Sequence, residues 1–158
     1  MVLFQKALPW MRQTKTFINI SNREMTQEEK DLLLKDLCAR LPYGVKVESV
    51  FINPDTKEHK SCGIEVFNAT SLLMIRDGLG EFKPYLFPLS SMTEEQKKEY
   101  NYWKHEVPVC RYEYGDVVEE IELYDSPASF EYLIENHFDY RGLIEKGLAI
   151  DATGLNIY

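Results

Sequence analysis

The residues that could do acid–base or metal chemistry gather around one histidine near the end of the chain. His137 lies between a glutamate at position 135 and Asp139. A histidine beside carboxylates can act as an oriented general base or bind a metal ion. A histidine at a helix end, where it meets the last carbonyls, explains the same spacing. Arg141 can pair with Asp139 or with a helix terminus. We therefore take His137, Asp139 and Arg141 as a possible ligand corner.

Other catalytic patterns are missing from the sequence. Its three histidines lie far apart and form neither HxxxH nor HExxH. Cys38, Cys62 and Cys110 are odd in number and form no CxxC pair, which predicts buried free thiols rather than disulfides or a zinc site. There is no GxSxG motif, and the glycines at 78 and 80 lack the Lys-Ser/Thr of a phosphate loop. On this basis we assign no catalytic residue, no metal and no cofactor.

A second candidate site is rich in tyrosine and glutamate. Residues 107–114 and 117–124 are two strand-like runs on either side of Gly115-Asp116, a spacing that predicts a hairpin with those two turn residues. Tyrosine is common at protein interfaces, and cross-strand packing explains it equally well. The candidate partner-binding residues are Tyr112, Tyr114, Glu119, Glu120, Glu122 and Tyr124.

The negative charge of the chain is concentrated in its last third. Residues 1–104 hold 15 Lys and Arg against 14 Asp and Glu, whereas residues 105–158 hold 3 against 12. Phosphates would be repelled there, so direct nucleic-acid binding is not expected. An acidic surface can instead occupy a basic groove on a protein partner. A solvated face that aids solubility is the other interpretation.

Several elements that would position these residues have clear sequence signals. Thr26 with Glu29, and Thr93 with Gln96, have the spacing of a capping box and predict helices to about Leu41 and Lys104. Ser126 before a proline predicts a third helix. Residues 45–52 and 62–66 alternate as a hairpin does, around a turn at 53–56.

The remaining elements are expected from weaker signals. Residues 72–75 form an apolar run that predicts a buried strand, and Pro84 confines residues 82–87 to a sheet edge. Asp139 can cap a last short helix that ends at Gly147, and the tail from Asp151 has no structure signal. Strand pairs mixed with separate helices indicate an α+β fold, with small antiparallel sheets and about four helices.

Length and composition predict a single domain that begins near Met25. The chain has 158 residues, 44% of them hydrophobic, which suffices for one core. Residues 1–24 hold four Lys or Arg and one Glu and show no period, so we expect a poorly ordered extension before a domain at 25–158. The sequence shows neither a membrane span nor a signal peptide, and a cytoplasmic protein is expected.

Three stretches carry a resemblance to a known family. They are residues 26–45 (TQEEKDLLLKDLCARLPYGV), 83–95 (KPYLFPLSSMTEE) and 136–149 (NHFDYRGLIEKGLA). In this order they resemble the opening, middle and closing motifs of a family of small uncharacterised proteins from Bacteroides-type gut bacteria and their phages or mobile elements. The resemblance implies no activity. It implies a bacterial cytoplasm, a prophage or mobile element as the setting, and a start equivalent to Met25.

Three functions follow as hypotheses. The leading one is a non-enzymatic interaction module of a phage or mobile element, which docks a protein through the acidic, tyrosine-rich hairpin. In a sharper form it is an anti-defence inhibitor whose acidic face imitates DNA. The alternatives are a small metal-dependent hydrolase that uses His137 with nearby carboxylates, and a structural subunit of a homo-oligomer.

Overall fold

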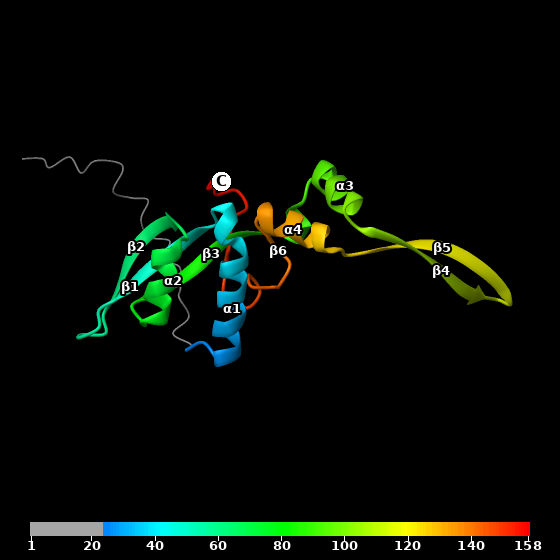
Figure 1. The fold of residues 1–158 in the computed structure, drawn as a ribbon. Coiled ribbons are helices and arrows are strands. Elements are labelled where there is room, and N and C mark those ends of the chain that lie inside the picture. The colour runs from blue at the N-terminus through cyan, green and yellow to red at the C-terminus, as the bar shows by residue number, and fades with distance from the viewer. Residues whose placement is uncertain (1–23) are drawn as a thin grey trace, which may run out of the picture.

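The structure is a computed structural model, and it describes residues 24–158 (Figure 1). These residues form a single α+β domain, as the sequence predicts. The expected extension at residues 1–24 lies, apart from Glu24, outside the described residues. The elements in chain order are α1 (Gln27–Arg40), η2 (Leu41–Tyr43), β1 (Lys46–Ile52), β2 (His59–Val66), α2 (Ala69–Arg76), β3 (Gly80–Pro88), η3 (Leu89–Ser91), α3 (Glu94–Tyr102), β4 (His105–Glu113), β5 (Asp116–Tyr124), α4 (Pro127–Glu135), β6 (Phe138–Asp139) and β7 (Ile150–Asp151).

The predicted helix starts are confirmed by their caps. The Thr26 hydroxyl accepts the backbone N–H of Glu29, and the Glu29 carboxylate accepts that of Thr26, so α1 opens with a capping box. Thr93 and Gln96 form the same pair at α3. Ser126 caps α4, whose first turn contains a proline. In each of these helices, a local side chain therefore satisfies one of the free amides of the first turn.

One mixed sheet and one separate hairpin hold the strands. The sheet has the order β2-β1-β3-β6, and β7 also pairs with β3. The β1–β2 hairpin is confirmed, and the side chain of Asn53 accepts the amides of Asp55 and Thr56 in its turn. Strands β6 and β7 run parallel to β3, so the C-terminal part of the chain returns to the strand that precedes the β4–β5 hairpin.

The prediction that Pro84 confines its segment to a sheet edge is wrong. β3 is central, with β1 on one side and β6 and β7 on the other. The amide of Ile52 bonds to the carbonyl of Leu79, and bonded and non-bonded pairs alternate along an antiparallel ladder. By that alternation the Val47–Pro84 pair is non-bonded. Pro84 therefore removes no hydrogen bond to β1, and β7 begins its pairing only at the next residue.

The prediction of a strand at residues 72–75 is also wrong, because these residues lie in helix α2. The Asn68 side chain accepts the amides of Thr70 and Ser71, and the Ser71 hydroxyl accepts the amide of Asn68. This cap directs the chain into a helix. Leu72, Met74 and Ile75 of the apolar run then pack against the core cluster.

Replacing Asn68 with alanine should lower the free energy of unfolding by about 1 kcal/mol, since the first turn of α2 loses its side-chain acceptor. Urea unfolding followed by circular dichroism measures the change. Thr70→Ala is the matched control, because Thr70 is exposed in the same turn. Equal midpoints for the two variants would contradict the assigned role of Asn68.

The C-terminal segment also differs from expectation. Residues 141–148 form turns rather than a helix, although Asp139 does accept amides there, as a cap would. The tail from Asp151 is structured: β7 pairs with β3, and the Tyr158 hydroxyl donates to the carbonyl of Tyr85. The expectation of buried thiols is wrong too, since Cys38, Cys62 and Cys110 are all exposed.

Two buried clusters form the core. In the larger one, α1 and α2 pack on one face of β1 and β3, with Leu37, Val47 and Leu86 almost fully buried. The smaller cluster joins α4 and β6 through Leu133 and Phe138. Figure 1 shows the β4–β5 hairpin extending away from both, beyond α3 and α4.

Candidate functional site

The hairpin of β4 and β5 is a two-stranded arm. Each strand pairs only with the other among the described residues, over the whole register from His105–Tyr124 to Glu113–Asp116. None of its residues is buried. An isolated two-stranded hairpin is at best marginally stable in water, because neither face is covered. The arm (residues 105–124) therefore has two open faces and two open edges.

The turn at the tip of the arm lies one residue earlier than predicted. Tyr114 and Gly115 have φ values of 52° and 97°, as a two-residue hairpin turn of the primed type requires, and Asp116 opens β5. As a result, each β4 residue faces a β5 residue two positions earlier than predicted. Because side chains alternate with a period of two, the faces on which they lie are unchanged.

The two faces of the arm differ in chemistry, because residues directly opposite each other share a face. One face (the apolar face) consists of Glu106, Pro108, Cys110, Tyr112, Val117, Glu119, Ile121 and Leu123. The other (the acidic face) consists of His105, Val107, Val109, Arg111, Glu113, Asp116, Val118, Glu120, Glu122 and Tyr124.

The predicted partner-binding residues do not form one cluster. Glu120, Glu122 and Tyr124 lie on the acidic face, whereas Tyr112 and Glu119 lie on the apolar face. Tyr114 stands at the tip, fully exposed. Glu120 and Glu122 are two residues apart on β5 and therefore share this face. The residues that the prediction missed are Ile121 and Leu123, whose exposed side chains make the other face apolar.

Interactions on the acidic face centre on Glu122. The Tyr124 hydroxyl donates to it at 2.6 Å, and Arg111 forms an ion pair with it and lies 3.8 Å from Glu120. The hydrogen bond from Tyr124 and the guanidinium of Arg111 lower the pKa of Glu122, and the same carboxylate raises the pKa of Tyr124. Glu122 therefore keeps its negative charge well below neutral pH.

The base of the arm is fixed between α3 and α4. The Tyr100 hydroxyl donates to Asp125 at 2.5 Å, and its ring stacks on that of Tyr132 at 6.3 Å. Burial, followed by the bond to Asp125, raises the pKa of Tyr100. The Ser126 hydroxyl donates to the carbonyl of Trp103 while it caps α4. Both ends of the arm are therefore tied to α3 and α4 by hydrogen bonds, although the arm itself is exposed.

The residues of the ligand corner are close in sequence but have separate roles. Asp139 accepts the amides of Leu143 at 2.9 Å and Ile144 at 2.8 Å. The Nε atom of Arg141 lies 3.3 Å from Asp36, and its guanidinium lies over the ring of Tyr140. Both side chains thus hold the turns after β6, and their nearest charged or polar partners lie within the fold.

His137 is buried and stacks on the ring of Tyr158, with 4.1 Å between the ring centroids. Its Nδ1 atom has no hydrogen-bond partner. Burial and the nearby charge of Arg40 lower the pKa of His137 to about 4. The imidazole is therefore neutral at neutral pH and is covered by the C-terminal residue rather than open to a substrate.

Sequence reasoning missed the buried ion pair of Asp36 and Arg40 on α1. Arg40 Nε donates to Asp36 at 2.7 Å, and Arg40 Nη2 donates to the carbonyl of Phe138 at 2.7 Å. Both side chains are fully buried. The available signal was their spacing of four residues on the helix face that also carries Leu33 and Leu37.

Within residues 24–158, no group of three or more His, Cys, Asp or Glu side chains could hold a metal ion. In the same part of the chain, no helix combines the length and the apolar character needed to cross a bilayer.

Comparisons with known proteins returned no match. No protein-family model, no curated protein and no solved structure matches this chain. The resemblance to the family from Bacteroides-type bacteria and their phages therefore stays a prediction.

Proposed function

We propose that this chain is a non-enzymatic protein-interaction module that holds its partner with the β4–β5 arm. The observation that carries the proposal is the open apolar face of the arm. Ile121 is 68% exposed and Tyr112 is 83% exposed, on strands that no other described element covers. Apolar side chains gathered on an open surface favour burial against another protein.

The charge of the arm narrows the choice of partner. Residues 105–124 hold six carboxylates and one arginine, a net charge of −5. The expected partner surface is therefore basic, with an apolar strip that receives Tyr112, Ile121 and Leu123. Aromatic and aliphatic anchors would supply most of the affinity, and the charges would speed association.

The setting of this function follows from the resemblance. A phage or mobile element gains from a protein that binds and blocks a host protein. In the sharper hypothesis, this chain is an inhibitor that fills the DNA-binding groove of a defence protein. The carboxylates at positions 113, 116, 120 and 122 share the acidic face and could meet the basic wall of such a groove. The apolar face would meet the partner's own hydrophobic residues.

Capture experiments with matched variants test the proposal. Ile121→Asp places a charge on the apolar face and should abolish capture of the partner from a Bacteroides lysate. Ile64→Asp is the control, because Ile64 is 55% exposed on a strand outside the arm. Proteins captured by the wild type and by Ile64→Asp, but lost with Ile121→Asp, identify the partner. Identical sets from all three proteins would contradict the proposal.

The two alternatives lack an observation in their favour. The metal-dependent hydrolase needs His137 and carboxylates around a common cavity, whereas Asp139 binds backbone amides and His137 stacks on Tyr158. For the homo-oligomeric subunit, a mass measured by light scattering at several concentrations is the direct test.

A further inference from the structure

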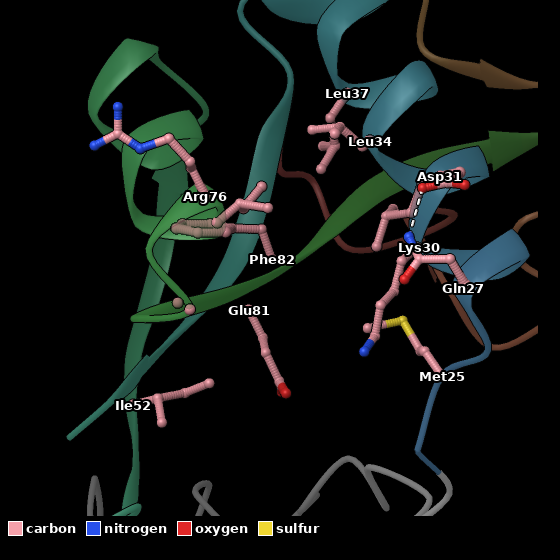
Figure 2. Close-up of a pocket in the computed structure, with 14 residues that line it drawn as sticks. Met25, Gln27, Lys30, Asp31, Leu34, Leu37, Ile52, Arg76, Glu81 and Phe82 are labelled. Atoms are coloured by element: carbon pink, nitrogen blue, oxygen red, sulfur yellow. Dashed lines mark hydrogen bonds between the residues drawn. The ribbon is translucent and has the colours of Figure 1, made fainter. Parts of the chain in front are cut away.

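A groove on the body of the domain lies between α1 and the segment from α2 into β3. It has a volume of about 510 Å³, within the range of pockets that bind ligands or peptide side chains. Figure 2 shows Met25 and Lys30 on one side of the hollow, and Ile52 and Glu81 on the other. The groove belongs to different elements from the arm, so it is independent of the proposed function.

The lining of the groove is apolar with a charged rim. Leu34, Ile52 and Phe82 are among the apolar side chains that line it, and Leu34 is 37% exposed. The charged side chains of the lining are balanced, with Lys30 and Arg76 against Asp31 and Glu81. A chain segment with large apolar side chains would bury this surface, and basic residues on that segment would be attracted by the net negative charge of the whole domain.

Residues 1–23 have this composition and are attached at the groove. They hold four basic residues and no carboxylate, whereas residues 24–158 hold 14 basic and 26 acidic residues. They also include large apolar side chains, among them Trp10 and Phe17. Met25, two residues after their end, lines the groove. A tethered segment has an effective local concentration in the millimolar range or above.

We propose that the groove is the docking site of the chain's own residues 1–23, bound within the same molecule. Apolar side chains of the segment fill the space against Leu34 and Phe82, and its lysines and arginines are attracted by the net negative charge of residues 24–158. This differs from the expectation of a loose extension before Met25. It also gives the charge contrast between the start of the chain and the rest a physical role.

Tryptophan fluorescence of the full chain tests the proposal. Trp103→Phe leaves Trp10 as the only tryptophan, and adding Trp10→Phe with Phe17→Trp moves the probe to position 17. At least one probe should resist quenching by acrylamide. Leu34→Asp in the groove should release it, with a several-fold rise in the quenching constant. Leu89→Asp is the control, since Leu89 is 42% exposed away from the groove, and it should leave quenching unchanged.

Three results would overturn the proposal. The first is quenching of both probes at the level of free tryptophan. The second is shielding that Leu34→Asp and Leu89→Asp affect equally. The third is shielding that falls on dilution together with a dimer mass in light scattering, because the occupant would then be a second copy of the chain. Circular dichroism of each variant verifies that it is folded, and a variant that fails is replaced by Leu34→Gln with Leu89→Gln.

Discussion

Replacing Asp36 with asparagine is expected to lower the free energy of unfolding by about 3–5 kcal/mol. The Asp36 carboxylate is fully buried and accepts two hydrogen bonds from Arg40, at 2.7 and 3.2 Å. Arg141 Nε lies 3.3 Å from Asp36 Oδ1, the oxygen that also accepts Arg40 Nη2. One carboxylate thus serves two guanidinium groups, and neutralising it leaves the buried charge of Arg40 uncompensated.

The chain offers an exposed pair of the same geometry as a control. Arg76 Nε donates to Asp77 at 2.7 Å and Arg76 Nη2 donates at 3.0 Å, so this pair is also bidentate. Its side chains are 68% and 45% exposed. Asp77→Asn should therefore change the free energy of unfolding only slightly, since water solvates the remaining charge of Arg76. Urea unfolding of both variants tests whether burial causes the large effect of Asp36→Asn. Equal losses in the free energy of unfolding for the two variants would contradict that explanation.

A double replacement separates the charge from the packing. Removing both members, as Asp36→Leu with Arg40→Met, should restore much of the stability that Asp36→Asn loses, because no fully buried charge is left without a partner. If the double variant is as unstable as Asp36→Asn, the loss of the hydrogen bonds from Arg40 to the carbonyls of Ile134 and Phe138 outweighs the gain from removing the unpaired buried charge.

The buried pair also has a structural consequence for the arm. Arg40 ends α1, and the carbonyls that it bonds belong to Ile134 in α4 and Phe138 in β6. It therefore links the larger core cluster to the smaller one. Because α4 follows the arm directly, this link fixes the base from which the proposed binding surface projects.

Elements with local signals were predictable from the sequence. The capping boxes at Thr26 and Thr93 and the turn at Asn53 are satisfied by residues within four positions, so the sequence contains the complete interaction. Helix α2 had a signal of the same kind in Asn68 and Ser71, but the apolar run at 72–75 fits a strand as well as a helix.

Long-range features were not predictable. Pro84 occupies the central strand because its ring lies at a non-bonded position, which depends on the register with β1. His137 is covered by Tyr158 and Arg40 bonds to Phe138, contacts between residues far apart in the sequence. The hairpin of the arm was predictable, but whether anything covers its apolar face depends on the rest of the fold.

The stability of the protein should depend on the ionisation of His137. Its pKa is about 4 in the folded chain and 6.5 in the unfolded one, because burial and Arg40 disfavour the imidazolium. A lowered pKa means that the unfolded chain binds the proton more readily. The contribution to stability is therefore full above about pH 6.5 and is lost as the pH falls toward 4.

The expected loss from this one group between pH 7 and pH 4.5 is about 2–3 kcal/mol, at roughly 1.4 kcal/mol per pH unit. His137→Asn removes the titration, and asparagine tolerates the positive φ of 59° at this position. The variant should be less stable at pH 7, since the stack on Tyr158 is lost, but should lose less stability on acidification.

Urea unfolding at pH 7, 6, 5 and 4.5 gives the free energy of unfolding of each protein as a function of pH. Carboxylates that both proteins share contribute equally to the two slopes, so the difference in slope reports His137. His59→Gln is the control: the His59 side chain is 54% exposed, and this variant should follow the wild-type profile. Parallel profiles for wild type and His137→Asn would show that His137 does not resist protonation in the fold. If only His137→Asn has a flatter profile, protonation of His137 causes the acid sensitivity of the domain. Because His137 stacks on Tyr158, which bonds to β3, acid would then weaken this contact.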